Sequence, residues 1–174
     1  PDFWQHAVAV ALLSRALGKR LDAQSGERFF VSGLLHDLGR LMLAMAEPDL
    51  AATILSRAGA EGLSLDAAER LELGFDHAEL GGRICAKWLL PDLLTEAVAC
   101  HHAPLQCPEN HQAAAVHLAD FMANALGLRA TPVVALPALD VAVLARFHLE
   151  DTDPGEFVEL LTQGLAAMTA LFVL

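Results

Sequence analysis

The chain has 174 residues, of which 55% are hydrophobic and 19% are charged, and its formal net charge is −11. A chain of this length buries roughly 70% of the surface that its unfolded form exposes, so it can form one domain with a substantial core. Its 11 lysines and arginines are scattered along the sequence. This excludes the clustered basic surface that a nucleic-acid partner would need, and we expect no such partner.

The longest uninterrupted apolar runs, such as residues 7–13, are much shorter than the about 20 residues of a membrane-spanning helix. We therefore expect no membrane partner. The sequence begins at Pro1 and shows no signal peptide, and we expect it to be a fragment. Its three cysteines form no C-x-x-C pair, and an odd count is a poor disulfide framework, so we expect no disulfide and a cytoplasmic location.

Apolar residues recur at three- and four-residue steps nearly everywhere, which predicts an all-α fold, a compact multi-helix bundle forming a single domain over residues 1–174. Gly18 and Gly127 look like helix stop signals, and Asp76 and Asp153 begin capping boxes with the glutamates three residues later. A long loop is expected over residues 128–140. In chain order, the predicted helices are 3–17, 26–36, 38–46, 49–59, 65–73, 77–89, 92–102, 109–126, 138–147 and 154–172.

The first predicted helix carries His6, with Asp2 one turn before it. At the end of the second, His36 and Asp37 interrupt an apolar run just before a glycine that allows the chain to turn. Adjacent residues within a regular helix point about 100° apart, but at a helix end both can face one partner. The pair is compatible with a buried His–Asp hydrogen bond and equally with a metal site.

Three further histidines follow at helix ends. His77 lies in the first turn of its helix, and His101 and His102 close the helix after it. Asp120 then lies on a strongly apolar helix, where an ionised carboxylate is costly to bury unless it is paired or bound to a cation. A local pair with His117, one turn earlier, is the alternative explanation.

The order of these residues, a histidine in an early helix, then His-Asp, a single His, His-His and a late Asp, resembles the HD superfamily of metal-dependent phosphohydrolases. The closest likeness is to the HDOD family, the HD-related output domain of bacterial signalling proteins. It covers roughly residues 3–126 and is carried by FWQHAVAVALLSRAL, FVSGLLHDLGRLML, FDHAELGGRICAKWLLPDLLTEAVACHHAP and AVHLADFMA. The N-terminal helical part that HDOD domains normally carry is missing from this sequence.

The resemblance implies a metal site with two divalent transition-metal ions, iron or manganese rather than zinc or magnesium. Asp37 would bridge the ions and act in catalysis, Arg40 would contact phosphate, and Asp2 could reach a further position. Cys100 is expected in the core and not among the ligands. The implied metal ligands are His6, His36, Asp37, His77, His101, His102 and Asp120.

For function, the resemblance implies a bacterial regulatory output domain that acts on a signalling partner or responds to a small phosphorylated ligand. The alternative is an active metal-dependent phosphohydrolase. A third interpretation gives the histidines a purely structural role. The Gly-Tyr-Pro signature of cyclic-dinucleotide phosphodiesterases is missing, and the chain contains no tyrosine, so cyclic-di-GMP hydrolysis is not expected.

Overall fold

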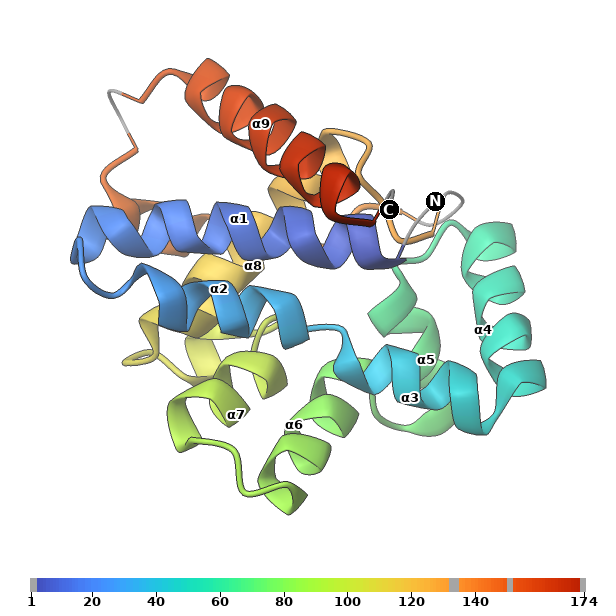
Figure 1. The fold of residues 1–174 in the computed structure, drawn as a ribbon. Coiled ribbons are helices and arrows are strands. Elements are labelled where there is room, and N and C mark those ends of the chain that lie inside the picture. The colour runs from blue at the N-terminus through green and yellow to red at the C-terminus, as the bar shows by residue number, and fades with distance from the viewer. Residues whose placement is uncertain (1–2, 132–134, 150–151, 173–174) are drawn as a thin grey trace.

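The computed structural model describes residues 3–131, 135–149 and 152–172, and over these ranges the chain is helical with no strand (Figure 1). This confirms the predicted all-α fold. The α-helices are α1 (Phe3–Leu21), α2 (Gly26–Leu35), α3 (Leu38–Ala46), α4 (Pro48–Glu61), α5 (Leu65–Leu73), α6 (His77–Lys87), α7 (Asp92–Ala99), α8 (His111–Ala125) and α9 (Pro154–Phe172), with 3-10 helices η1 (Pro104–Gln106) and η2 (Val141–Phe147).

Two glycines that look alike in the sequence have different roles. Gly127 follows α8 with a φ of +82°, as a helix stop does. Gly18 does not end α1, which runs on to Leu21, so the predicted stop is wrong. A Cβ at Gly18 would lie 2.4 Å from a ring carbon of Phe29, which shows that this glycine allows α1 and α2 to pack closely.

Other helix ends also differ from the prediction. Helix α7 ends at Ala99, so His101 and His102 lie in the turn that follows it, and the predicted helix over 138–147 is only the 3-10 helix η2. Asp76 caps α6 as expected, accepting a hydrogen bond from the Glu79 amide at 2.9 Å. Asp153 caps α9 through the amide of Gly155 at 2.9 Å, and not through a side-chain bond to Glu156.

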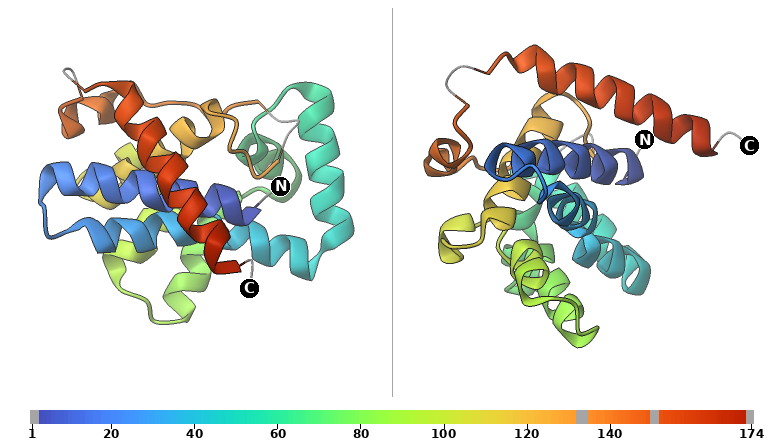
Figure 2. Two further views of the ribbon diagram at one scale, coloured as in Figure 1. Left: turned by 45° about the horizontal axis from the view of Figure 1, so that its top comes forward. Right: turned by 60° about the vertical axis from the view of Figure 1, so that its left-hand side comes forward.

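Helix α1 is the centre of the larger core. It lies between α9 and α2 in Figure 1 and in the right-hand view of Figure 2, and it also packs on α8. Val10, Leu13 and Leu17 of α1 are fully buried against residues of α8, η2 and α9. Phe157 and Leu161 of α9 are buried in the same cluster, so the last helix packs on this core through these side chains.

Helices α3 to α6 form a second part of the fold beside this core. The N-terminal end of α3 lies directly against the start of α6 because Gly39 has no side chain. A Cβ at Gly39 would lie only 2.1 Å from the carbonyl oxygen of His77 and 2.6 Å from the amide nitrogen of Gly81. This close approach places Asp37, two residues before Gly39, beside His77.

The structure corrects the prediction about cysteines. Cys100 and Cys107 form a disulfide, with their Cα atoms 6.4 Å apart. The 3-10 helix η1 turns the chain back after α7 and brings Cys107 within the separation that a disulfide spans. A cysteine count says nothing about such a local reversal, which is why the parity argument failed. Cys85 remains a buried free thiol.

One stretch, Gly26–Ala46, is long and apolar enough to cross a membrane when judged by length and composition alone. In the structure this stretch consists of α2 and α3, which are divided at His36 and Asp37. Both residues at the division are buried polar groups inside the fold. Core helices of a folded domain pass the same test, so the finding is weak evidence for a membrane span.

Candidate metal centre

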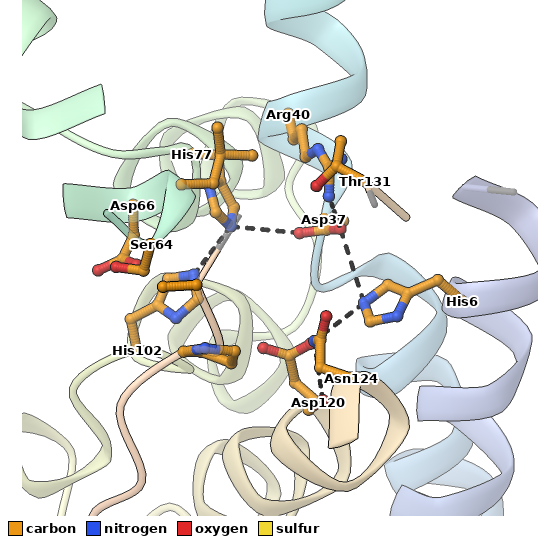
Figure 3. A pocket seen from close by; sticks show the side chains of 13 residues that line it. His6, Asp37, Arg40, Ser64, Asp66, His77, His102, Asp120, Asn124 and Thr131 are labelled. Carbon is orange, nitrogen blue, oxygen red and sulfur yellow. Dashed lines mark hydrogen bonds and ion pairs between the residues drawn. The ribbon is translucent and has the colours of Figure 1, made fainter. Parts of the chain in front are cut away.

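The seven predicted ligand residues converge on one place, although they come from distant parts of the chain. Figure 3 shows five of them, His6, Asp37, His77, His102 and Asp120. His6 lies in the first turn of α1, and His77 in the first turn of α6. The turn between α2 and α3 supplies a His-Asp pair, the turn after α7 supplies two histidines, and α8 supplies an aspartate. All seven are buried except His102, which is partly exposed; they are His6, His36, Asp37, His77, His101, His102 and Asp120.

Three of the histidines are fixed in the same way. In each, the Nδ1–H donates to a backbone carbonyl, so that the proton is held on Nδ1 and the lone pair of Nε2 faces the common centre. These bonds join His6 to Leu128, His36 to Gly33 and His101 to Val98, at 2.7, 2.8 and 2.8 Å. The backbone therefore sets these imidazoles in the tautomer that a metal ligand needs.

His77 is fixed by a carboxylate instead. Its Nδ1 lies 2.6 Å from Oε2 of Glu69, and the same oxygen accepts the backbone N–H of His77 at 2.8 Å. Glu69 is 1% exposed. The Nε2 atoms of His77 and His102 lie 2.9 Å apart, a separation at which a proton lies between them when no cation does. A carboxylate behind an imidazole is a typical outer partner of a metal ligand.

Asp37 lies between two groups of nitrogen donors. Its Oδ1 is 3.2 Å from Nε2 of His77 and 3.5 Å from Nε2 of His36, while its Oδ2 is 3.9 Å from Nε2 of His6. The guanidinium of Arg40 donates to Oδ2 at 3.1 Å. Arg40 is therefore held at the site by this bond and is not a freely solvated helix residue. The carboxylate is placed where it could bridge two cations.

Asp120 closes the site from α8. Its Oδ1 lies 3.1 Å from Nε2 of His6 and accepts a hydrogen bond from Asn124 at 2.7 Å. His117 does not form the local pair with Asp120 that the sequence allowed. Its Nδ1–H donates to the carbonyl of His101 at 2.7 Å, and its Nε2 accepts the amide of Asp140 at 2.8 Å. His117 thus supports the histidine turn from behind.

Two ligand nitrogens in this cluster have no hydrogen-bond partner in the part of the chain that the structure describes. They are Nε2 of His36 and Nε2 of His101, and both are buried, although Nε2 of His36 lies 3.5 Å from Oδ1 of Asp37. A buried polar atom that is left unpaired costs about 1–3 kcal/mol, and such atoms in a folded protein call for an explanation. Two sets of three donors have all their ligand atoms within 4.8 Å of one another: His6, His36 and Asp37, and His77, His101 and His102. A cation in each set would satisfy the two unpaired nitrogens.

The electrostatics favour neutral imidazoles at three positions. Burial lowers the pKa of His36 from its ordinary value, and Asp37 only partly offsets this. Burial, together with the neighbouring histidines, lowers the pKa of His101 to about 3 and that of His102 well below the ordinary value. These three side chains therefore present unprotonated nitrogens at neutral pH, as metal ligands must.

The carboxylates stay ionised although they are buried. Burial raises the pKa of Asp37, but its interactions with His36, with the guanidinium of Arg40 and with His77 outweigh this effect, and the net pKa is well below the ordinary value. The pKa of Asp120 is lowered in the same way by His6. Burial opposes protonation of His6 and His77, yet their acidic partners raise both pKa values. These two histidines are therefore more easily protonated than an ordinary imidazole.

Sequence reasoning missed two residues of the site. Glu69 holds His77 and contacts the centre only through it, whereas Asn124 holds Asp120 and also lines the small cavity at the cluster. Nothing in the acid-rich stretch around Glu69 separates it from the exposed Glu72. Asn124 lies one turn after Asp120 on the same helix, and this spacing was a usable signal. Asp2, the further candidate, lies outside the described residues.

A small cavity of about 40 Å³ opens at the cluster, with Asp37, Arg40, His77 and Asp120 among the residues that line it (Figure 3). A water molecule needs roughly 10–15 Å³ of such space. The cavity can therefore hold small ions or a few waters, but a larger ligand would have to extend beyond it.

Comparison of the sequence with protein families finds the HDOD domain over residues 1–104, which is more than half of the chain. The matched range contains six of the seven clustered residues, and Asp120 lies beyond it. An uncharacterised protein of Treponema pallidum is 23% identical over 112 residues. That match covers 64% of this chain and 22% of the longer protein.

Solved structures with this fold come from several bacteria. A protein of Marinobacter aquaeolei, provisionally named a signal transduction protein, has a TM-score of 0.81 and 21% identity, over 98% of this chain and 38% of that one. A protein of Shewanella amazonensis, provisionally named a phosphohydrolase, has a TM-score of 0.69 and 27% identity, over 92% and 58%.

The response regulator MmoQ of Methylococcus capsulatus has a TM-score of 0.62 and 28% identity, over 91% of this chain and 59% of that one. The chain thus spans less than two thirds of each of these longer proteins. The family match and the shared helical fold lead to one conclusion: this chain belongs to the HDOD domain family.

Proposed function

We propose that this protein is a regulatory output domain of HDOD type that binds two divalent transition-metal ions in the His/Asp cluster. The observation that carries the proposal is the pair of buried, unpartnered Nε2 atoms of His36 and His101, which face a centre that also contains ionised carboxylates. A cation at each position would remove the cost of the unpaired nitrogens and of the buried negative charge.

In this proposal, His6 and His36 would hold one ion together with Asp120, whose Oδ1 lies 3.1 Å from Nε2 of His6. The set of His77, His101 and His102 would hold the other ion, and Asp37 would be shared between the two. Imidazole nitrogens and carboxylate oxygens form the whole set. Cys100 is bonded to Cys107, so it offers no thiolate. Seven such donors, shared by two ions of higher coordination number, suit iron or manganese. Zinc is usually tetrahedral, and magnesium prefers oxygen ligands to imidazole nitrogens.

The regulatory role is supported by the family and by two structural relatives, one named a response regulator and one provisionally named a signal transduction protein. In this proposal, the occupied site stabilises the contact between α1, the α2/α3 turn, α6, the turn after α7 and α8. A signalling-protein partner or a small phosphorylated ligand would then read that state. The cytoplasmic location stays a prediction, and the Cys100–Cys107 disulfide counts against it, because disulfides are rare in a reducing compartment.

Metal content tests the proposal. Protein purified without chelator, from cells supplied with iron and manganese, should contain close to two equivalents of metal by elemental analysis. His36→Ala and His101→Ala should each lose about one equivalent, because each removes an unpaired donor of a different set. His111→Ala, a histidine at the start of α8 outside both sets, is the control and should keep both. Metal-free wild-type protein would refute the proposal.

A second candidate function is hydrolysis of a phosphoester. Arg40 favours it, since its guanidinium lines the cavity beside Asp37 and can form paired hydrogen bonds with a phosphate. Bound ions would supply Lewis-acid activation of water and of the phosphoryl group. The relative provisionally named a phosphohydrolase lends support. Metal-loaded protein should then cleave members of a broad phosphoester panel. Full metal occupancy with no cleavage would contradict this second function, and only the regulatory role would stand.

A further inference from the structure

A second and much larger cavity, of about 350 Å³, lies between α3, α4 and α5. Its volume falls within the roughly 300–1,000 Å³ of small-molecule sites. Most of its lining is apolar, with Leu43, Pro48, Ala51, Ile54, Leu55 and Leu65 among the residues described. Three residues, Arg40, Leu65 and Thr131, line this cavity and also the small cavity of the metal centre, so the two adjoin.

Arg40 is the one lysine or arginine among the described residues that line either cavity, and its side chain is 18% exposed. The small cavity is also lined by three carboxylates, Asp37, Asp66 and Asp120, whose charge the two proposed ions would offset. Glu69 also lines the larger cavity, but its Oε2 accepts both N–H groups of His77. An anionic group at the junction would therefore meet the guanidinium, while the rest of the same molecule would meet an apolar wall.

We propose that the ligand of this domain is an anionic amphiphile. Its phosphate head would lie at Arg40 and the two ions, and its apolar tail would fill the cavity between α3, α4 and α5. The inference rests on the proposed metal site and goes beyond it, since it names the chemical class of the ligand. A tail is what distinguishes this class from a compact phosphate, because the cavity at the cluster itself holds only about 40 Å³.

The test is calorimetric titration of metal-loaded protein with methyl-, butyl- and octylphosphonate, which share a head group that a phosphohydrolase cannot cleave from oxygen. Burial of each methylene in the apolar cavity should tighten binding about fourfold, until the cavity is full. Octyltrimethylammonium carries the same tail with the opposite charge. It should bind at least about tenfold more weakly than octylphosphonate, because Arg40 repels it.

Two tryptophan substitutions locate the tail. Ala51→Trp would fill the cavity from α4. It should abolish the increase in affinity with alkyl chain length and leave the affinity for methylphosphonate unchanged. Ala60→Trp, on an exposed part of the same helix outside both cavities, is the matched control and should keep the gain. If Ala51→Trp does not fold, Ala44→Trp makes the same test from an exposed position on α3.

The outcomes separate the two proposals. Metal content is measured first, and protein without metal would refute the proposed function. Metal-loaded protein that binds methyl- and octylphosphonate equally well, or binds neither, would overturn the amphiphile inference while the metal site stands. Equal binding of octylphosphonate to wild type and to the folded Ala51→Trp variant would also overturn it, because the tail would then lie elsewhere.

Discussion

Glu69 offers a sharp test of how the site is built, because it contacts the centre only through His77. Glu69→Gln keeps the shape of the side chain but removes its charge. Two hydrogen bonds to a carboxylate, at 2.6 and 2.8 Å, then become at best bonds to a neutral amide. Charged hydrogen bonds contribute about 1.5–3 kcal/mol and neutral ones about 0.5–1.5 kcal/mol, so the expected loss is roughly 2–3 kcal/mol over the two bonds.

This loss should weaken the binding of the ion held by the set of histidines that contains His77. It corresponds to roughly 30- to 150-fold weaker binding of one metal, close to the 10- to 100-fold typical of outer-partner mutations. Competition titration with a chelator of known affinity should show one weakened and one nearly unchanged equivalent. Glu72→Gln removes the same charge from an exposed position on α5 and is the control. Unchanged affinity for both equivalents in folded Glu69→Gln would refute the reasoning.

Three further predictions concern packing, pH and charge. Gly39→Ala places a Cβ 2.1 Å from the carbonyl oxygen of His77, so overpacking should cost about 1–3 kcal/mol of stability in chemical denaturation and weaken metal binding. The pKa of His101 is lowered from 6.5 to about 3, so its contribution to stability is full above pH 6.5 and is lost as the pH falls, because only the unfolded chain takes up the proton. As the pH falls from 5.5 to 4.5, the free energy of unfolding of metal-free His101→Gln should therefore decrease by about 1.4 kcal/mol less than that of metal-free wild type. Equal decreases in the two proteins would contradict the assignment. Arg40→Gln should keep both metals but bind inorganic phosphate about tenfold more weakly by calorimetry, whereas loss of metal would show that Arg40 mainly fixes Asp37.

The local part of the fold could be predicted from the sequence. Helices α3 and α5 match their predicted ranges, since apolar periodicity and turn residues specify both ends. Helix α1 shows the limit of this reasoning. Gly18 reads as a stop, but its missing side chain serves the packing of Phe29, and only the neighbouring helix reveals that.

The sequence predicted the His and Asp side chains that the candidate site brings together, but not the groups that hold them in position. His36 and Asp37 stand out because polar residues are rare in an apolar run, and their order with the other histidines carries the family resemblance. Glu69 gave no such signal. Its burial depends on how α5 packs beside the start of α6, and a glutamate on an acid-rich helix is ordinarily solvated. The orientation of each imidazole was likewise beyond the sequence, because it depends on backbone carbonyls such as that of Leu128.

Anomalous diffraction from crystals of the metal-loaded protein tests the central claim most directly, since it locates each ion and, by its absorption edge, identifies the element. The account predicts two peaks on either side of the Asp37 carboxylate, one bonded to Nε2 of His36 and the other to Nε2 of His101. A fully occupied crystal with its metal elsewhere, or with both nitrogens still unbonded, would contradict it.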